Sequence, residues 1–261
     1  MDIIIYILGS IGAGKTSFTQ LLHDNFNFPV HYEDVNNGLI KGMLNKFYNA
    51  GAESRKVYSP MLQVAFLTVR FKQLKTAIQQ HNAVLDSNLL SDWIMANNLH
   101  NRGEMDDDCF NVYMNLNQEM QSIVNGFDFA YPDLIIYLDI SKDHELEEIA
   151  KRGRDMEDVR HDAKLVDYYH SVNDAYTNWY NGAVQSPVLR IDRDKYDFVN
   201  NVNDRRITFQ LVLDKLYQLG KLDKEEYDDF TQKNIKSNAP VEDNDNIDAK
   251  LISVHEIKKQ D

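Results

Sequence analysis

The sequence predicts a three-layer α/β fold, in which a central parallel sheet carries helices on both faces. Short apolar runs of strand length alternate with longer amphipathic segments along most of the chain, and this alternation is typical of a parallel sheet with crossover helices. A glycine-rich segment follows the first apolar run and opens the first helical segment. The strand-like runs are residues 3–8, 28–34, 83–86, 134–138 and 187–191.

The glycine-rich segment has the pattern G-x-x-x-x-G-K-[ST] between a predicted strand and a predicted helix, which is the context that a phosphate-binding loop requires. A glycine-rich turn without a ligand is the alternative, and the complete octet in this context disfavours it. Lys15 would reach the β- and γ-phosphates, and the Thr16 hydroxyl would hold Mg²⁺. The fold class is therefore of the P-loop NTPase type. The expected phosphate-binding residues are Gly9, Ser10, Ile11, Gly12, Ala13, Gly14, Lys15, Thr16 and Ser17.

Each helical segment is predicted from apolar residues that recur at helical spacing. The longest is expected to begin at Pro60, because proline favours the first turn of a helix, and it carries Leu62, Phe66 and Val69 on one face. Ligands of such a fold lie beyond the carboxyl ends of the strands. The expected helices are residues 17–23, 35–48, 60–80, 89–99, 109–124, 144–152, 163–179 and 207–219.

Composition limits the function classes. The chain has 261 residues, a net charge of −13 and one cysteine, so no internal disulfide can form and sequence-independent binding to nucleic acid is disfavoured. The first apolar run ends at Gly9 and no run approaches bilayer-spanning length, so we expect a cytoplasmic protein without a membrane segment. Residues 1–222 form the predicted domain. Residues 223–261 hold eleven acids and six lysines, and we expect them to be a mobile acidic extension.

Three further features are candidates for chemistry. Asp86 and Asp139 each end a strand-like run, and either could coordinate Mg²⁺ opposite the phosphate loop or be an ordinary polar strand end. Basic residues surround Gly153 in the segment 151–154, which suits either a lid over a transferring phosphoryl group or a solvated helix end; the upstream phosphate loop favours the lid. Glu33 follows a strand-like run and could be a general base or an ordinary surface glutamate.

The order of these motifs resembles the deoxynucleoside kinase family, and most closely the bacterial deoxyadenosine and deoxyguanosine kinases. The resemblance runs from Met1 to about Leu222. Its stretches are the phosphate loop, residues 32–35, Gln63 with Arg70, residues 86–88 with Asp92, residues 132–138, residues 152–154, residues 167–169 and residues 191–198. It implies an ATP-dependent kinase that acts on a deoxynucleoside, and a homo- or heterodimer with a related subunit.

The resemblance also implies a role for each matching position. Glu33 would be the general base and Asp86, rather than Asp139, the acid near Mg²⁺. Gln63, Arg70 and Asp92 would bind the base, while Tyr48 and Glu157 would hold the 3′-hydroxyl. The resemblance further implies that the lid arginines are Arg152 and Arg154, and that the contacts to the donor adenine come from Asp197 and Phe198.

Two departures bear on the activity, because Ser87 and Glu148 stand where the family usually has arginine. Both remove positive charge near the expected triphosphate site. We therefore expect a slow kinase that transfers the ATP γ-phosphate to the 5′-hydroxyl of a purine deoxynucleoside. The alternatives are a weakly active or silent nucleotide-binding subunit that regulates a partner kinase, and a nucleoside monophosphate kinase of the same architecture.

Overall fold

The computed structural model describes residues 3–125, 132–153, 163–182 and 186–237. Within these residues a five-stranded sheet forms in the order β2-β3-β1-β4-β5, and every neighbouring pair is parallel. This confirms the predicted fold class. The strands are β1 (Ile4–Gly9), β2 (Val30–His31), β3 (Ala83–Leu85), β4 (Leu134–Asp139) and β5 (Val188–Asp192).

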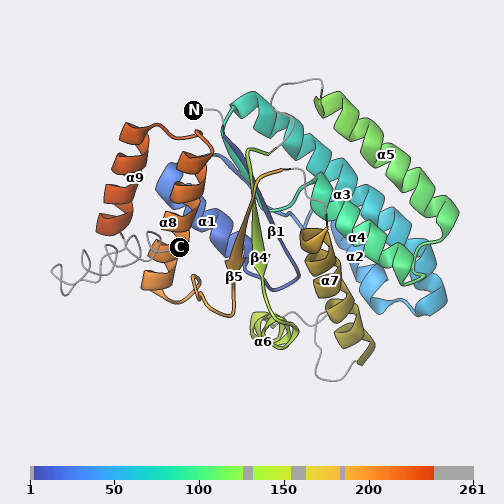
Figure 1. The fold of residues 1–261 in the computed structure, drawn as a ribbon. Helices are drawn as coiled ribbons and strands as arrows, with labels where there is room; N and C mark the ends of the chain where they lie inside the picture. Colours follow the sequence, from blue (N-terminus) through green and yellow to red (C-terminus); the bar gives the residue numbers. More distant parts are fainter. Residues whose placement is uncertain (1–2, 126–131, 154–162, 183–185, 238–261) are drawn as a thin grey trace.

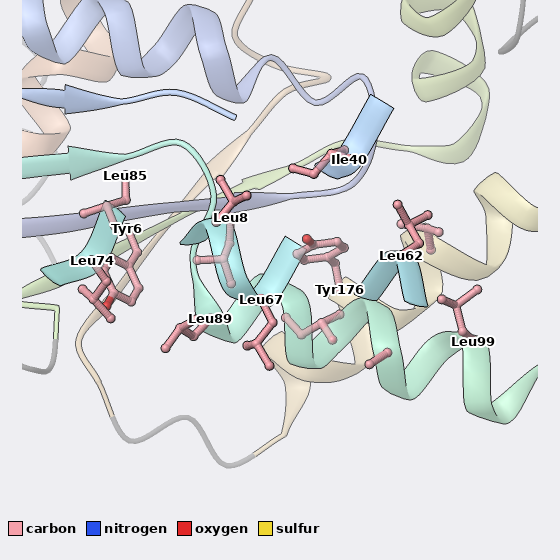
Figure 2. Packing of buried hydrophobic residues seen from close by; sticks show 14 of the residues in the cluster. Tyr6, Leu8, Ile40, Leu62, Leu67, Leu74, Leu85, Leu89, Leu99 and Tyr176 are labelled. Atoms are coloured by element: carbon pink, nitrogen blue, oxygen red, sulfur yellow. The ribbon is translucent and has the colours of Figure 1, made fainter. Parts of the chain in front are cut away.

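Alternate side chains of the central strands enter two separate hydrophobic clusters. In β1, Tyr6 and Leu8 point into one cluster, while Ile5 and Ile7 point into the other. Strands that are buried on both faces read as continuous apolar runs rather than as alternating ones, which explains the sequence of β1 and β4. Figure 2 shows Tyr6 and Leu8 in the first cluster, together with Tyr176 and leucines from the surrounding helices.

The helices cover the two faces unequally (Figure 1). Helices α1, α8 and α9 lie on one side of the sheet, the larger group α2, α3, α4, α5 and α7 lies on the other, and α6 lies beyond the end of β4. The carboxyl ends of the strands therefore face α6 and the loop after β1. The helices are α1 (Lys15–Phe26), α2 (Gly38–Asn49), α3 (Ala52–Gln80), α4 (Leu89–Asn101), α5 (Asp107–Asn125), α6 (Lys142–Arg152), α7 (Ala163–Asn181), α8 (Val202–Gln218) and α9 (Lys224–Ser237).

Helix α3 begins before Pro60, so the predicted start of this helix is wrong. Proline lacks the N–H that would bond to the preceding turn, yet two turns of α3 precede it. Arg55 anchors these turns, because its guanidinium stacks over the ring of Phe47 and pairs with Glu104 at 3.6 Å. Ser59 donates a 2.8 Å hydrogen bond to the Arg55 carbonyl. These contacts therefore stabilise the helical turns before Pro60, although proline prefers the first turn of a helix.

The expectation that residues 223–261 form a mobile extension is wrong for residues 224–237. These residues form α9, which packs on α8 and α1 through Tyr227 and Phe230. The ring of Phe230 lies 5.0 Å from that of Phe26, and the Asn234 side chain is buried and donates to the Arg206 carbonyl. The acidic residues of this segment lie on the exposed face of an amphipathic helix, whose other face is apolar. None of the helices in the described residues is long and apolar enough to cross a membrane.

Candidate active site

The loop between β1 and α1 has the geometry of a phosphate cradle. Gly12 and Gly14 have φ angles of 85° and 87°, a conformation that favours glycine. A Cβ at Gly12 would lie 3.2 Å from the Glu145 carbonyl and 3.2 Å from a carbon of Ile149, so α6 touches the loop directly. Helix α1 begins immediately after Gly14. Its first N–H groups and its dipole therefore favour an anion in the loop.

The ammonium of Lys15 folds back over this loop. It donates hydrogen bonds to the carbonyls of Gly9 at 3.0 Å and Ser10 at 2.9 Å. Burial lowers the pKa of Lys15, although the charges of Glu33 and Asp86 partly oppose this effect. A partly buried cation that is held only by neutral carbonyls can turn toward a phosphate oxygen, which offers it a stronger, charge-assisted bond.

Thr16 and Asp86 meet across the carboxyl ends of β1 and β3. The Thr16 hydroxyl donates a 2.7 Å hydrogen bond to Oδ2 of Asp86, whose other oxygen, Oδ1, is buried without a hydrogen-bond partner in the part of the chain described here. Burial raises the pKa of Asp86. Asp139 instead pairs with Arg190. The geometry therefore favours Asp86 over Asp139 as the acid beside the loop.

A cavity of about 590 Å³ opens in front of the loop and joins the predicted site residues. Most of the predicted positions share this one space, whereas Asp197 and Phe198 do not line it. The predicted residues that line it are Gly9, Ile11, Gly12, Gly14, Lys15, Thr16, Ser17, Glu33, Tyr48, Gln63, Arg70, Asp86, Asp92 and Arg152, while Ser10 and Ala13 belong to the loop but lie beneath its surface.

Glu33 projects into this cavity from the segment after β2. Its carboxylate forms an ion pair with Arg70, and Ser87 Oγ donates to it at 3.4 Å. Burial acts to raise the pKa of Glu33, but Arg70 and Lys15 more than offset this, so the pKa lies below its usual value. The carboxylate is consequently ionised and available as a proton acceptor at neutral pH.

Polar side chains from α3 and α4 close the far end of the cavity. Arg70 pairs with Asp92 as well as with Glu33, and its guanidinium lies over the ring of Phe66 at 4.6 Å. Asp92 is fully buried. Oε1 of Gln63 is buried and, among the described residues, has no hydrogen-bond partner. These groups can present donors and acceptors to the edge of a flat heterocycle.

The loop after β5 is the part of the predicted site that does not enter the cavity. Phe198 is buried beneath the phosphate loop, with its ring 4.8 Å from that of Phe18. Asp197 accepts hydrogen bonds from the next turn at Val199 and Asn200, and those two residues line the cavity instead. A contact from Asp197 or Phe198 to a donor base stays a prediction.

Beside Phe198 lies a buried cation that sequence reasoning missed. The Arg193 side chain is about 1% exposed, stacks over the Phe198 ring at 4.5 Å and donates to the Tyr196 carbonyl at 2.7 Å. Its Nη2 lies 3.9 Å from Glu148. In the sequence, Arg193 cannot be distinguished from the many surface arginines that follow a strand. Its position under the phosphate loop is evident only from the fold.

The predicted lid is only partly described. Arg152 ends α6 and lines the cavity, whereas Arg154 and Glu157 lie outside the described residues. The Glu148 carboxylate contacts Lys151 at 2.7 Å and also lies near His144 and Arg193. The missed residues that line the cavity are mainly apolar or small: Leu44, Phe47, Leu62, Phe66, Ser91, Met95, Tyr168 and Tyr176.

Comparisons with known proteins show the family of this chain. The deoxynucleoside kinase family model matches residues 5–218. A deoxyguanosine kinase of Lactobacillus acidophilus is 34% identical over 219 residues, covering 84% of this chain and 93% of the relative. A deoxyadenosine kinase of the same organism is 32% identical over 219 residues, covering 84% of this chain and 99% of that relative.

A solved structure of deoxyadenosine kinase from M. mycoides with bound dCTP is similar in fold. Its TM-score is 0.65 at 23% identity, with 83% of this chain and all of that chain covered. The family model spans the phosphate loop, the Glu33 segment and the helices that carry Gln63, Arg70 and Asp92. The chain is a member of the deoxynucleoside kinase family.

Proposed function

We propose that this protein transfers the γ-phosphate of ATP to the 5′-hydroxyl of a purine deoxynucleoside. The observation that carries the proposal is that Glu33 and the phosphate loop line one cavity, with Lys15 on the loop side and Arg70 on the other. A purine is supported by relatives that are named deoxyguanosine and deoxyadenosine kinase.

The chemistry is an in-line displacement at the γ-phosphorus. The ionised carboxylate of Glu33 takes the proton of the substrate 5′-hydroxyl as its oxygen bonds to phosphorus. The bond to the bridging oxygen breaks, and ADP leaves with that oxygen. Lys15 and Arg152 supply positive charge to the oxygens on which negative charge develops. The products are ADP and the deoxynucleoside 5′-monophosphate, with the proton initially on Glu33.

The acceptor is held at the end of the cavity away from the phosphate loop. Gln63 and Asp92 bind the edge of the base, and Arg70 orients both Asp92 and Glu33 through its two ion pairs. Tyr48 lines the same cavity and would meet the 3′-hydroxyl together with Glu157. This arrangement fixes the 5′-hydroxyl next to the base that deprotonates it, which reduces the entropy barrier of the transfer.

The residues present fit a bound Mg²⁺. The described residues contain no group of three or more metal-ligating side chains, but Mg²⁺ bound with nucleotide uses one or two protein ligands besides phosphate and water. Thr16 and Asp86 supply these, and the unpartnered Oδ1 of Asp86 is a buried oxygen suited to a cation. Bound Mg²⁺ would neutralise charge on the phosphate oxygens.

The decisive experiment is a phosphorylation assay of the purified protein with four deoxynucleosides, ATP and Mg²⁺. We expect monophosphate formation from deoxyadenosine or deoxyguanosine, and none by the Lys15→Ala variant. A protein that phosphorylates deoxynucleoside monophosphates instead would be a monophosphate kinase. A protein that binds ATP and phosphorylates nothing without a second subunit would be a regulatory partner.

The proposal also includes the oligomeric state of the protein and its location in the cell. The family resemblance supports a dimer, either with a second copy or with a related kinase subunit, and this is tested by sedimentation of the purified chain. A cytoplasmic location is supported by the need for ATP and by a single cysteine, Cys109, which fits a reducing compartment.

A further inference from the structure

A fully buried carboxyl group lies against the phosphate loop and has no part in the transfer described above. Glu145 is 0% exposed and lies on the first turns of α6, the helix that touches Gly12. Acidic residues in the first turn of a helix are usually solvated partners of its dipole. This one instead points inward, between the loop and α7, as its contact with Asn173 shows. Helices α6 and α7 lie near each other in Figure 1.

The contacts of Glu145 tie these three elements together. Its Oε2 accepts a 2.9 Å hydrogen bond from Nδ2 of Asn173 on α7. The same amide nitrogen donates to the Ile140 carbonyl at 2.9 Å and lies 3.5 Å from the hydroxyl of Ser10 in the loop. Ser10 is itself buried and interacts with the Glu145 carboxyl. A change in the state of this carboxyl therefore reaches the backbone that would hold the phosphates.

The charges around Glu145 do not balance an ionised carboxylate. Its Oε1 has no hydrogen-bond partner of good geometry within residues 3–125, 132–153, 163–182 and 186–237. The cations that act on it are Lys15 from the loop and Lys142 from its own helix, but Lys15 bonds to loop carbonyls and Lys142 pairs with Asp174 of α7. Glu148, one turn along α6, also lies beside Gly12, and its carboxylate pairs with Lys151 and lies 3.9 Å from Arg193 rather than near a cation shared with Glu145.

Burial raises the pKa of Glu145 to about 7, against the opposing effects of Asn173, Ser10 and the two lysines. Because the folded pKa is raised, the neutral acid predominates below that value and the carboxylate above it. In the neutral form, Oε1 gains a proton that it can donate to the Ser10 hydroxyl. In the ionised form, the charge lies beside the place where a triphosphate would bind and repels it.

We propose that Glu145 is a positioning residue of the phosphate loop that acts as a neutral acid, holding Ser10 against Asn173, and that the binding of a nucleoside triphosphate requires its protonated form. This inference rests on the proposed binding of ATP. It assigns Glu145 no contact with the nucleotide. The proton balance is simple: ATP binding above neutral pH takes up one proton per Glu145 that was ionised.

The test measures ATP binding without any deoxynucleoside, by calorimetry with Mg²⁺ present, from about pH 6 to about pH 8.5. We expect the dissociation constant of the wild type to rise roughly 30-fold over this range, because the neutral fraction of a carboxyl with a pKa of about 7 falls by that factor. The rise should be absent in Glu145→Gln, which mimics the neutral acid. Glu145→Asp keeps a titrating carboxyl and should keep a rise. Glu147→Gln changes an exposed glutamate of the same helix and should behave as the wild type.

Repeating the titration in two buffers of different ionisation enthalpy counts the protons directly. Proton uptake by the wild type and none by Glu145→Gln supports the proposal. An equal pH dependence of ATP binding in the wild type and in Glu145→Gln overturns the proposal. If Glu145→Gln does not fold, the wild type alone decides, and ATP binding without proton uptake then overturns the proposal. The phosphorylation assay decides the proposed function separately: pH-dependent ATP binding without any deoxynucleoside phosphorylation overturns that function and leaves the assignment of Glu145 standing.

Discussion

The Thr16 hydroxyl donates a 2.7 Å hydrogen bond to Asp86, which joins the first turn of α1 to the end of β3 across 70 positions of sequence. The two strands that carry these residues, β1 and β3, are parallel neighbours, so their carboxyl ends lie side by side. The alignment of the sheet thus brings the hydroxyl of Thr16 to Asp86, which the local sequence pattern marked only as one of two candidates.

Replacing Asp86 with asparagine should lower the catalytic activity without lowering the stability of the fold. Asparagine at this position keeps the size of the side chain and can still accept from Thr16, but it loses the charge, so we expect kcat to fall by about 10²-fold or more. The folded pKa of Asp86 is raised, and the carboxylate therefore destabilises the fold as pH rises through that value. At neutral pH the melting temperature of Asp86→Asn should equal or exceed that of the wild type. A normal kcat would show that Asp86 holds no metal.

Glu33→Gln should lower kcat by about 10²- to 10⁴-fold, which is typical for the loss of a general base, with little change in ATP affinity. The pKa of Glu33 is depressed, so its carboxylate persists below the usual pH of glutamate titration and is lost only as pH falls through the depressed value. The acid limb of kcat/KM should therefore lie below the ordinary glutamate range. Glu53→Gln, an exposed position on α3, is the matched control, and a pH profile unchanged by Glu33→Gln would contradict the assignment.

Ser87→Arg should raise turnover by about tenfold or more, because it restores a cation beside the triphosphate site. Ser87 lines the cavity and lies next to Glu33, so an arginine there can extend toward the phosphates. Ser87→Met, similar in bulk but uncharged, is the control in the same steady-state assay. If both variants are equally slow, another cation already fills this role.

Truncation after Leu222 should destabilise the protein, because it removes α9 and exposes the apolar surfaces around Phe26, whose ring packs against Phe230. Uncovering these apolar surfaces is worth on the order of 3 kcal/mol, or a fall of roughly 6–12 °C in melting temperature for a chain of this length. Truncation after Ser237 retains α9 and isolates its contribution. Equal melting temperatures for the two truncated proteins would show that α9 adds no stability.

The parts of the protein that the sequence predicts well are those with strong local patterns. The octet from Gly9 to Thr16 combines conformational and chemical requirements that few other sequences meet. The continuous apolar runs of β1 and β4 are typical of strands that are buried on both faces of a sheet. Glu33 could be proposed only as a candidate, because its ion pair with Arg70 depends on two segments 37 positions apart.

The parts that escaped prediction depend on the packing of distant segments. The helical turns before Pro60 are held by contacts of Arg55 with Phe47 and Glu104, and the acidic composition of residues 224–237 concealed an apolar face. Glu145 looked like an ordinary acid in the first turn of a helix, and only the position of α6 against Gly12 shows that it is buried.

The burial of Arg193 beneath the phosphate loop affects how tightly the donor nucleotide and its product are bound. A cation fixed under the loop attracts the triphosphate and the diphosphate product alike, since it cannot move with the lid or follow the transferred group. Such uniform attraction increases the time for which nucleotide stays bound without lowering the chemical barrier. Arg193 should therefore add to the affinity for ADP as well as for ATP, so that accumulated ADP competes with fresh donor for the loop and slows the enzyme as its own product builds up.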